Sequence, residues 1–333
     1  MTKRTKISVA VITYNQQDTI RQTLDSILCQ KGDFDLELVI GEDCSKDNTL
    51  TICKEYAEKY PDIIKLLSGP KNLGITANYF RTLQACTGDL IGDIAGDDFY
   101  CDEYALDKQL KYLQSHPEVG FMGANGYQYL VRRNEKIPGL NPVVTAEDSN
   151  AKEFYFSSSY PGGVYIKPVG VMFRKELLQY IDFDEIIRRN LPVEDYPIQA
   201  IWSQYTKFAC LPDLLVTYRI YSESATFVSF DHPKYLKYHK GLMDTRRYLN
   251  ELFPTDACFS ENWMQDYEFY KEYLLYLHQK KYHEVQRIIK ESVHLKGKPH
   301  YEQAKRFSSS FILFLCFHFY KEYAYYQQLK QRV

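Results

Sequence analysis

The sequence contains no long uninterrupted hydrophobic run. The longest apolar stretch, residues 311–320, includes His318 and is much shorter than the ~20 residues that a membrane-spanning helix needs. We therefore expect no transmembrane helix. The chain begins with residues 1–4 (Met-Thr-Lys-Arg) and continues directly into a strand pattern, so we also expect no signal peptide.

Paired cysteines and a strong net charge are also missing. The eight cysteines form no Cys-x-x-Cys motif, which favours reduced thiols in a cytoplasmic protein. The formal net charge of −2 over 333 residues gives no sign of a protein that binds nucleic acids through a basic surface. We accordingly expect a cytoplasmic protein without a nucleic-acid partner.

The turn after the first predicted strand lacks both glycine and basic residues. That strand covers residues 7–12, and residues 13–17 (Thr-Tyr-Asn-Gln-Gln) follow it. A dinucleotide-dependent oxidoreductase should show Gly-x-Gly-x-x-Gly at this turn, and a sugar-phosphate nucleotidyltransferase should show a glycine-rich loop with Arg and Lys. The absence counts against both classes. The nucleotidyltransferase stays an alternative because it would share the fold class predicted next.

Strand and helix patterns alternate through the first third of the chain. Short apolar segments at residues 7–12, 36–40, 63–67 and 90–95 predict buried strands, and segments with helical spacing separate them. This alternation predicts an α/β fold with a Rossmann-like, mostly parallel, twisted sheet flanked by helices. From about residue 233 the pattern is helical and aromatic. We place a boundary near Val228, which gives an α/β domain at 1–228 and a helical region at 229–333.

Polar clusters follow three of the predicted strands. They are residues 13–15 (Thr-Tyr-Asn), 41–43 (Gly-Glu-Asp) and 96–98 (Gly-Asp-Asp). The carboxyl ends of parallel strands form the ligand-binding edge of such sheets. We therefore expect the three clusters to meet in one site.

The acids in these clusters suit a metal ion and a nucleotide. Asp97 and Asp98 are costly at the end of a buried strand unless they are paired or bound to a cation, and Mg²⁺ commonly uses one or two carboxylates plus substrate phosphates. The alternative is that they form a turn or cap the next helix. Asp43 can accept hydrogen bonds from a nucleoside, or it can cap the helix after it. We interpret Asp93, earlier in the same strand, as a polar strand position rather than a metal ligand.

The order of the motifs resembles that of glycosyltransferase family two, whose members have the GT-A fold. Residues 9–15 are similar to the opening strand of the family, and residues 42–49 (Glu-Asp-Cys-Ser-Lys-Asp-Asn-Thr) to its acid-rich turn. Residues 72–88 are similar to its third motif, residues 95–100 (Ala-Gly-Asp-Asp-Phe-Tyr) to its DXD metal motif, and residues 193–196 (Val-Glu-Asp-Tyr) to its Glu-Asp motif. The resemblance extends from residue 7 to about residue 225.

The resemblance implies a role for each matching residue. Residues implied to bind the nucleotide are Thr13, Tyr14, Asn15, Asp43, Asn78, Arg81 and Asp97. Asp98 would be the carboxylate ligand of Mn²⁺ or Mg²⁺. Asp195 would be the catalytic base that deprotonates the acceptor hydroxyl, and Glu194 would orient it. Without the resemblance, Glu194 and Asp195 would more simply cap a helix.

The resemblance also implies a reaction. A sugar would pass with inversion from a nucleotide-sugar donor, most commonly a UDP-sugar, to a saccharide or lipid-linked saccharide in bacterial surface-polysaccharide synthesis. Two residues depart from the family pattern: Ala95 stands where an acid is common and Tyr221 where a His is common, so the metal site rests on fewer ligands. The other alternative is a non-catalytic nucleotide-sugar-binding protein, against which the presence of Asp98 and Asp195 weighs.

Basic and aromatic residues gather toward the C-terminus. Residues 281–333 contain ten Lys or Arg against four Asp or Glu. A basic, aromatic helix can lie at a membrane surface, and family members that extend lipid-linked saccharides work there. The alternatives, which we slightly favour, are a helical cap packed on the first domain and a homodimer contact.

Overall fold

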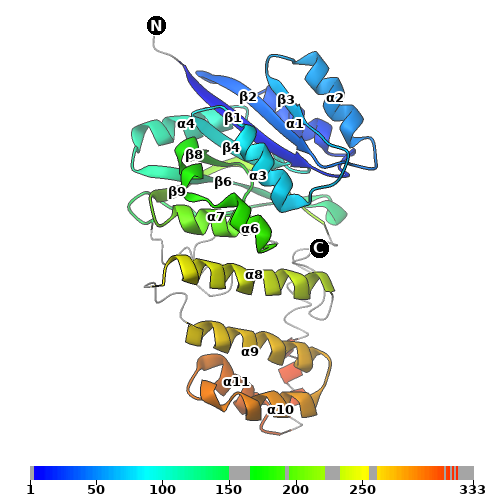
Figure 1. Cartoon of the computed structure of the whole chain (residues 1–333), viewed down its shortest axis with the longest axis vertical. Helices are drawn as coiled ribbons and strands as arrows, with labels where there is room; N and C mark the ends of the chain where they lie inside the picture. The colour runs from blue at the N-terminus through cyan, green and yellow to red at the C-terminus, as the bar shows by residue number, and fades with distance from the viewer. Residues whose placement is uncertain are drawn as a thin grey trace. The chain divides into compact units, whose positions relative to one another are not determined.

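The chain forms two compact units, residues 1–219 and 220–333 (Figure 1). The computed structural model describes residues 4–149, 166–191, 195–221, 233–254, 261–310, 313–315, 317–318 and 320–321. The predicted domain boundary near Val228 lies outside these residues.

One sheet, nine-stranded over the described residues, organises the N-terminal unit. Its parallel half has the order β3-β2-β1-β4, and its other half continues β8-β6-β9-β5 with β7 paired to β6. The strands are β1 (Thr5–Thr13), β2 (Phe34–Glu42), β3 (Ile64–Leu67), β4 (Leu90–Ala95), β5 (Phe99–Tyr100), β6 (Val119–Leu130), β7 (Glu135–Pro138), β8 (Val171–Arg174) and β9 (Lys207–Ile220). The sequence-based prediction of an α/β fold with a mostly parallel sheet is confirmed, and all four predicted strands are present.

Helices cover both faces of the sheet (Figure 1). One face carries α1 (Ile20–Leu28), α2 (Thr49–Lys59) and α4 (Ala105–Ser115). The other face carries α3 (Ile75–Ala85), α6 (Phe183–Arg188) and α7 (Asp195–Trp202). Two short 3₁₀ helices, η1 (Val131–Arg133) and η2 (Lys175–Tyr180), follow β6 and β8.

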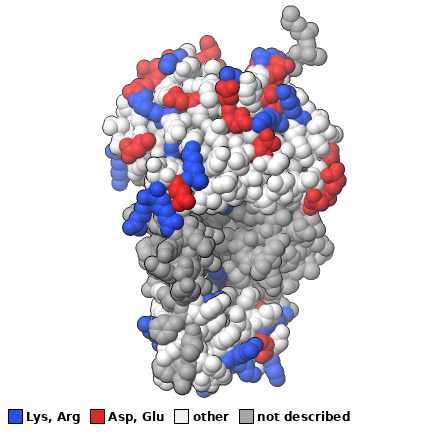
Figure 2. Space-filling view, turned by 180° about the vertical axis from the view of Figure 1, so that it is seen from behind, with Lys and Arg blue, Asp and Glu red and all other residues white. Residues whose placement is uncertain are grey.

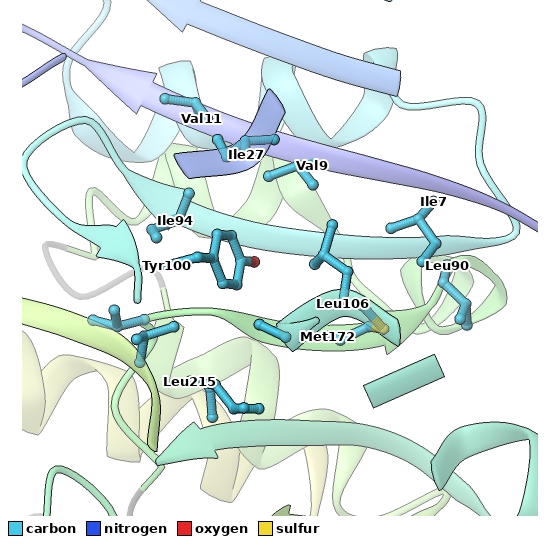
Figure 3. Packing of buried hydrophobic residues seen from close by; sticks show 14 of the residues in the cluster. Ile7, Val9, Val11, Ile27, Leu90, Ile94, Tyr100, Leu106, Met172 and Leu215 are labelled. Carbon is cyan, nitrogen blue, oxygen red and sulfur yellow. The ribbon is translucent and has the colours of Figure 1, made fainter. Parts of the chain in front are cut away.

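Alternation along the strands decides which side chains meet which helices. In β1, Val9 and Val11 point into the core beneath α1 and α4, where Figure 3 shows them with Ile94 and Leu106. Tyr100 lies in the same apolar layer, burial raises the pKa of its phenol, and its hydroxyl finds no hydrogen-bond partner among the described residues. This layer holds the strands in register so that their carboxyl ends share one edge.

The C-terminal unit is helical, as the pattern after residue 233 predicts. It contains α8 (Pro233–Leu252), α9 (Glu261–His278), α10 (Tyr282–Glu291), η4 (Val293–Leu295) and α11 (Pro299–Phe307). Tyr273, Val285 and Ala304 lie at the centre of its own core. None of the helices described in the chain has the length and apolarity to cross a membrane. Figure 2 shows basic and acidic side chains interspersed over one face of the N-terminal unit.

Candidate active site

A pocket of about 400 Å³ lies at the carboxyl ends of β1, β2 and β4. Five of the seven residues predicted to bind a nucleotide line it: Thr13, Tyr14, Asp43, Asn78 and Asp97. The expected convergence of the three polar clusters is therefore present. Gln16, Asn72 and Ile75 also line the pocket. A larger cavity of about 710 Å³, at the opposite ends of β1 and β4, has Thr5 and Gly88 in its lining and none of the predicted site residues.

Asp43 builds one wall of the pocket. Its carboxylate accepts hydrogen bonds from the backbone amides of Leu73 (2.7 Å) and Gly74 (3.0 Å). In return the Asn72 side-chain amide donates to the Asp43 carbonyl at 2.8 Å. Asp43 therefore fixes the turn before α3 and does not cap α2, which begins six residues later at Thr49. The amides of this turn donate to Asp43, which lies about 30 positions earlier in the chain, so no local sequence pattern could have predicted the pairing.

Asn78 and Arg81 attach α3 to the end of β2. The Asn78 amide donates to the Gly41 carbonyl at 2.8 Å, and its oxygen accepts from the Arg81 guanidinium at 2.6 Å. Arg81 also donates to the Glu42 carbonyl at 3.1 Å. Asn78 reaches the pocket, whereas Arg81 is absent from its lining. Arg81 thus acts in this structure by holding Asn78.

Asn15 joins the loops that follow β1 and β2. Its φ of 53° is in the left-handed region, which Asn tolerates better than most residues. Its backbone amide donates to Ser45 Oγ (2.9 Å), and its side-chain oxygen accepts from the Lys46 amide (2.8 Å). Asn15 is absent from the pocket lining. The structure therefore places it outside the pocket lining, where it ties two of the polar clusters together.

Two polar atoms in the pocket lining are buried without a partner. Thr13 Oγ1 and Gln16 Oε1 have no hydrogen-bond partner among the described residues. Leaving a buried polar atom unsatisfied costs about 1–3 kcal/mol. Both atoms lie against Gly96, where an added Cβ would come within 2.5 Å of Gln16 Oε1 and 2.7 Å of Thr13 Oγ1.

Asp97 and Asp98 form a turn that begins at the end of β4, where the Asp98 amide donates to the Ala95 carbonyl at 3.0 Å. Asp97 lines the pocket, and the Asp98 carboxylate, 1% exposed, accepts from the Arg219 amide at 2.8 Å. The Arg219 guanidinium also donates to the Asp97 carbonyl. The turn alternative is thus correct for the backbone, whereas helix capping is not, because α4 starts only at Ala105.

Burial raises the pKa of Asp97 and raises that of Asp98 well above its usual value, with the charge of Asp97 adding to the second shift. A bound divalent cation reverses such shifts. No three His, Cys, Asp or Glu side chains gather into a metal-binding group anywhere in the described chain. Two adjacent carboxyls beside a pocket still fit Mg²⁺ or Mn²⁺, since substrate phosphates and waters commonly complete the coordination.

Asp195 is the first residue of α7 and is only 8% exposed. Burial, together with the Asp195 charge, raises the pKa of Asp93 in β4 to about 7. Asp195 thus lies near β4, the strand that Asp97 and Asp98 follow, on the face occupied by α3. Glu194 lies outside the described residues. The sequence-based interpretation of Asp93 as a simple polar strand position missed this interaction, and an acid inside a buried apolar strand was the available signal.

Comparison with known proteins gives the family. The family profile described as "Glycosyl transferase family 2" matches residues 8–180. An uncharacterized protein of Mycobacterium tuberculosis is 38% identical over 213 residues, covering 64% of this chain and 58% of the relative. The dTDP-rhamnosyl transferase RfbG of Shigella flexneri is 29% identical over 181 residues, covering 54% and 57%. The chain therefore spans less than two thirds of the length of these relatives.

Solved structures agree on the fold. The mannosyltransferase PcManGT of Pyrobaculum calidifontis, solved with GDP-Man and Mn²⁺, has a TM-score of 0.53 at 16% identity, covering 96% of this chain and 88% of that one. TarS of S. aureus, solved with UDP, has a TM-score of 0.50 at 19% identity, covering 90% and 87%. With the family profile spanning more than half of the sequence and a GT-A-like architecture around the pocket, the chain belongs to glycosyltransferase family 2.

Proposed function

We propose that this glycosyltransferase moves one sugar, with inversion, from a nucleoside-diphosphate sugar to a saccharide hydroxyl. One observation carries the proposal: residues from three separate strand ends line a single pocket beside the half-buried carboxyl of Asp97 and the buried carboxyl of Asp98. A nucleotide in that pocket would direct its phosphates toward Asp97 and Asp98.

A pyrimidine donor, UDP-linked, is the form we favour. TarS was solved with UDP, and RfbG is named for a dTDP-sugar. A GDP-sugar is the alternative, by likeness to PcManGT. The acceptor we propose is a saccharide or lipid-linked saccharide of a bacterial surface polysaccharide, because RfbG and AmsE, an amylovoran biosynthesis glycosyltransferase of Erwinia amylovora, are relatives.

Different residues of the chain would act on the leaving diphosphate and on the attacking hydroxyl. Asp97 and Asp98 would hold Mn²⁺ or Mg²⁺, which when bound stabilises negative charge on the leaving diphosphate. Thr13, Tyr14 and Asn78 would hold the nucleoside. Asp195 would accept the proton of the attacking hydroxyl as the bond to the anomeric carbon forms and the bond to the diphosphate breaks. A single displacement inverts the anomeric centre and needs no covalent enzyme intermediate.

The test combines donor binding with transfer. UDP-, dTDP- and GDP-sugars are screened with Mn²⁺ by thermal shift, because a ligand that binds the native state stabilises it. Transfer is then followed by nucleotide release, and the anomeric configuration of the product by NMR. Stabilisation by a donor without any transfer or hydrolysis would instead support the binding-protein alternative.

The sharpest variant is Asp195→Asn, which should lower kcat roughly 10²–10⁴-fold because general-base catalysis is lost. Donor affinity should be unchanged, since Asp195 is absent from the pocket lining. The matched control is Asp62→Asn at an exposed position, which should behave as wild type. Full activity in Asp195→Asn would remove Asp195 from the role of base.

A further inference from the structure

Asp93 is an acid in the middle of a buried strand. It lies in β4, paired with Ala10 of β1 on one side and Val171 of β8 on the other, and is 5% exposed. Leu90 and Ile94 of the same strand belong to the core under α1 and α4. Asp93 has the opposite parity and therefore faces α3 and α7. A carboxyl in this position is costly unless its charge is removed or compensated.

The contacts of Asp93 supply only part of that compensation. The Tyr79 hydroxyl of α3 donates to Oδ2. Oδ1 is buried and has no hydrogen-bond partner among the described residues. Burial raises the pKa of Asp93 to about 7. The Tyr79 bond opposes this shift, the Asp195 charge adds to it, and the Val171 amide has the smallest, opposing effect. The carboxyl is therefore protonated below neutral pH, and Oδ1 is the oxygen left to hold the proton.

The packing of α7 explains why Asp195 lies near Asp93. Trp202, the last residue of α7, packs on Phe173 of β8 with ring centroids 4.4 Å apart, and Phe173 pairs with Ile91 of β4. Asp195 lies seven residues before Trp202, which places it on the same stripe of the helix and roughly 10 Å along its axis. Asp93 lies two residues beyond Ile91, roughly 7 Å along the strand. The chain before α7 fixes the direction: the Leu191 carbonyl, four residues before Asp195, accepts from Thr76 Oγ1 in the first turn of α3 at 3.2 Å, and Tyr79 in the next turn bonds Asp93. The start of α7 and Asp93 therefore meet at the same end of α3.

We propose that Asp93 is a positioning residue for Asp195, a buried carboxyl kept protonated so that the pair carries one negative charge and that charge resides on Asp195. The proposal rests on the proposed function, in which Asp195 receives the acceptor proton. Two carboxyls in one low-dielectric site cannot both ionise readily, so one proton is retained by the pair. A neutral Asp93 leaves Asp195 as the anion of the pair.

The side chains that act on Asp93 come from two helices. In the part of the chain that the structure describes, these are Tyr79 from α3 and Asp195 from α7, while β8 contributes the backbone amide of Val171 and β1 the apolar Ala10. Tyr100 lies across the sheet, against Gly92 in the core beneath α4. The state of the pair is therefore set by Tyr79 and Asp195 and can be perturbed from either side.

The first arm of the test measures the pair itself. In the full chain with ¹³C-labelled aspartate carboxyls, NMR should find one carboxyl that titrates near pH 7. That titration should disappear in Asp93→Asn and move to lower pH in Asp195→Asn, because the neighbouring charge is gone. A titration near pH 7 that persists in Asp93→Asn, or that Asp195→Asn leaves in place, would overturn the proposal.

The second arm measures the reaction at pH 6, where Asp93 is protonated. Asp93→Ala should lower kcat roughly 10–100-fold through misplacement of Asp195, with the donor KM within about twofold because the pocket is intact. Asp93→Asn, which is neutral and still accepts from Tyr79, should restore kcat to within about threefold. Unchanged kcat in Asp93→Ala would refute the positioning role while leaving the proposed function standing. A wild-type chain that transfers no sugar but shows the coupled titration would refute the proposed function alone.

Discussion

The two halves of the N-terminal sheet build the site in different ways. In the parallel half, polar side chains fasten one loop to the next: Asn15 to the loop after β2, Asp43 to the turn before α3, and Asn78 to the end of β2. In the other half, α7 is held mainly by aromatic packing of Trp202 on Phe173 and Phe121, with one hydrogen bond from the Trp202 indole to the Leu177 carbonyl. The difference indicates that the pocket is fixed by directional bonds, whereas the proposed base is placed by the way a helix packs.

β4 is the seam between the halves, because it pairs with β1 on one side and β8 on the other. The largest expected effect is at Asp93 on this seam. Its folded pKa of about 7 lies above the usual 3.8, so the native state holds a proton that the unfolded chain releases between these values. Stability from this group is greatest below pH 3.8 and is lost as pH rises toward 7, by about 1.4 kcal/mol per pH unit and about 4 kcal/mol in total.

This loss can be measured by urea unfolding at pH 5 and pH 8, followed by Trp202 fluorescence in a Trp263→Phe background. Relative to Asp93→Asn, the wild-type unit should lose about 2–3 kcal/mol between the two values. Equal pH dependence in both proteins would mean that Asp93 is ionised throughout. Asp93 and Asp195 would then carry two negative charges instead of one.

The contrast between the halves also decides what the sequence could predict. The strands and the three polar clusters follow from local apolar patterns and from the rule that parallel strands end at one edge, so Tyr14, Asp43 and Asp97 were placed correctly in one pocket. The same rule could not separate the residues that line the pocket from their neighbours that do not. Asn15, with its left-handed backbone conformation and its bond to the Lys46 amide, is absent from the lining.

Residues outside the parallel half were harder to place. Asp195 was proposed from a family motif. Its position near Asp93 depends on the pairing register of β8 and on the packing of Trp202 against Phe173, and both are set by tertiary structure. Arg219, more than a hundred residues after Asp98, holds the carboxyl turn through its backbone amide and its guanidinium. A backbone amide carries no sequence signal, so that contact could not be predicted.

A second prediction concerns the contacts that attach α3 to the end of β2. A Cβ at Gly41 would collide with Thr82 Oγ1 and would come within 3.0 Å of Asn78 Oδ1. Gly41→Ala should therefore destabilise the N-terminal unit by about 1–3 kcal/mol and weaken donor binding, because Asn78 must move. Urea unfolding and a UDP titration measure the two effects. Gly69→Ala is the matched control, since its Cβ would meet only Arg81, at 3.8 Å; equal behaviour of both variants would contradict the tight seat of α3.

The smallest expected effect is at Asn72, which tests whether the turn before α3 acts on the donor alone. Asn72 donates to the Asp43 carbonyl and accepts from the Gly74 amide at 3.0 Å. Asn72→Ala removes both bonds from a partly exposed turn, a loss of about 1 kcal/mol or roughly fivefold in donor affinity. kcat should not change, because the described hydrogen bonds of the Asn72 side chain go only to Asp43 and Gly74 and none reaches α7. Lys71→Ala, at the exposed neighbouring position, should leave both quantities unchanged. If Asn72→Ala lowered kcat instead of donor affinity, a change in the pocket wall would affect the proposed base. The parallel half of the sheet and the half that carries α7 would then not act independently.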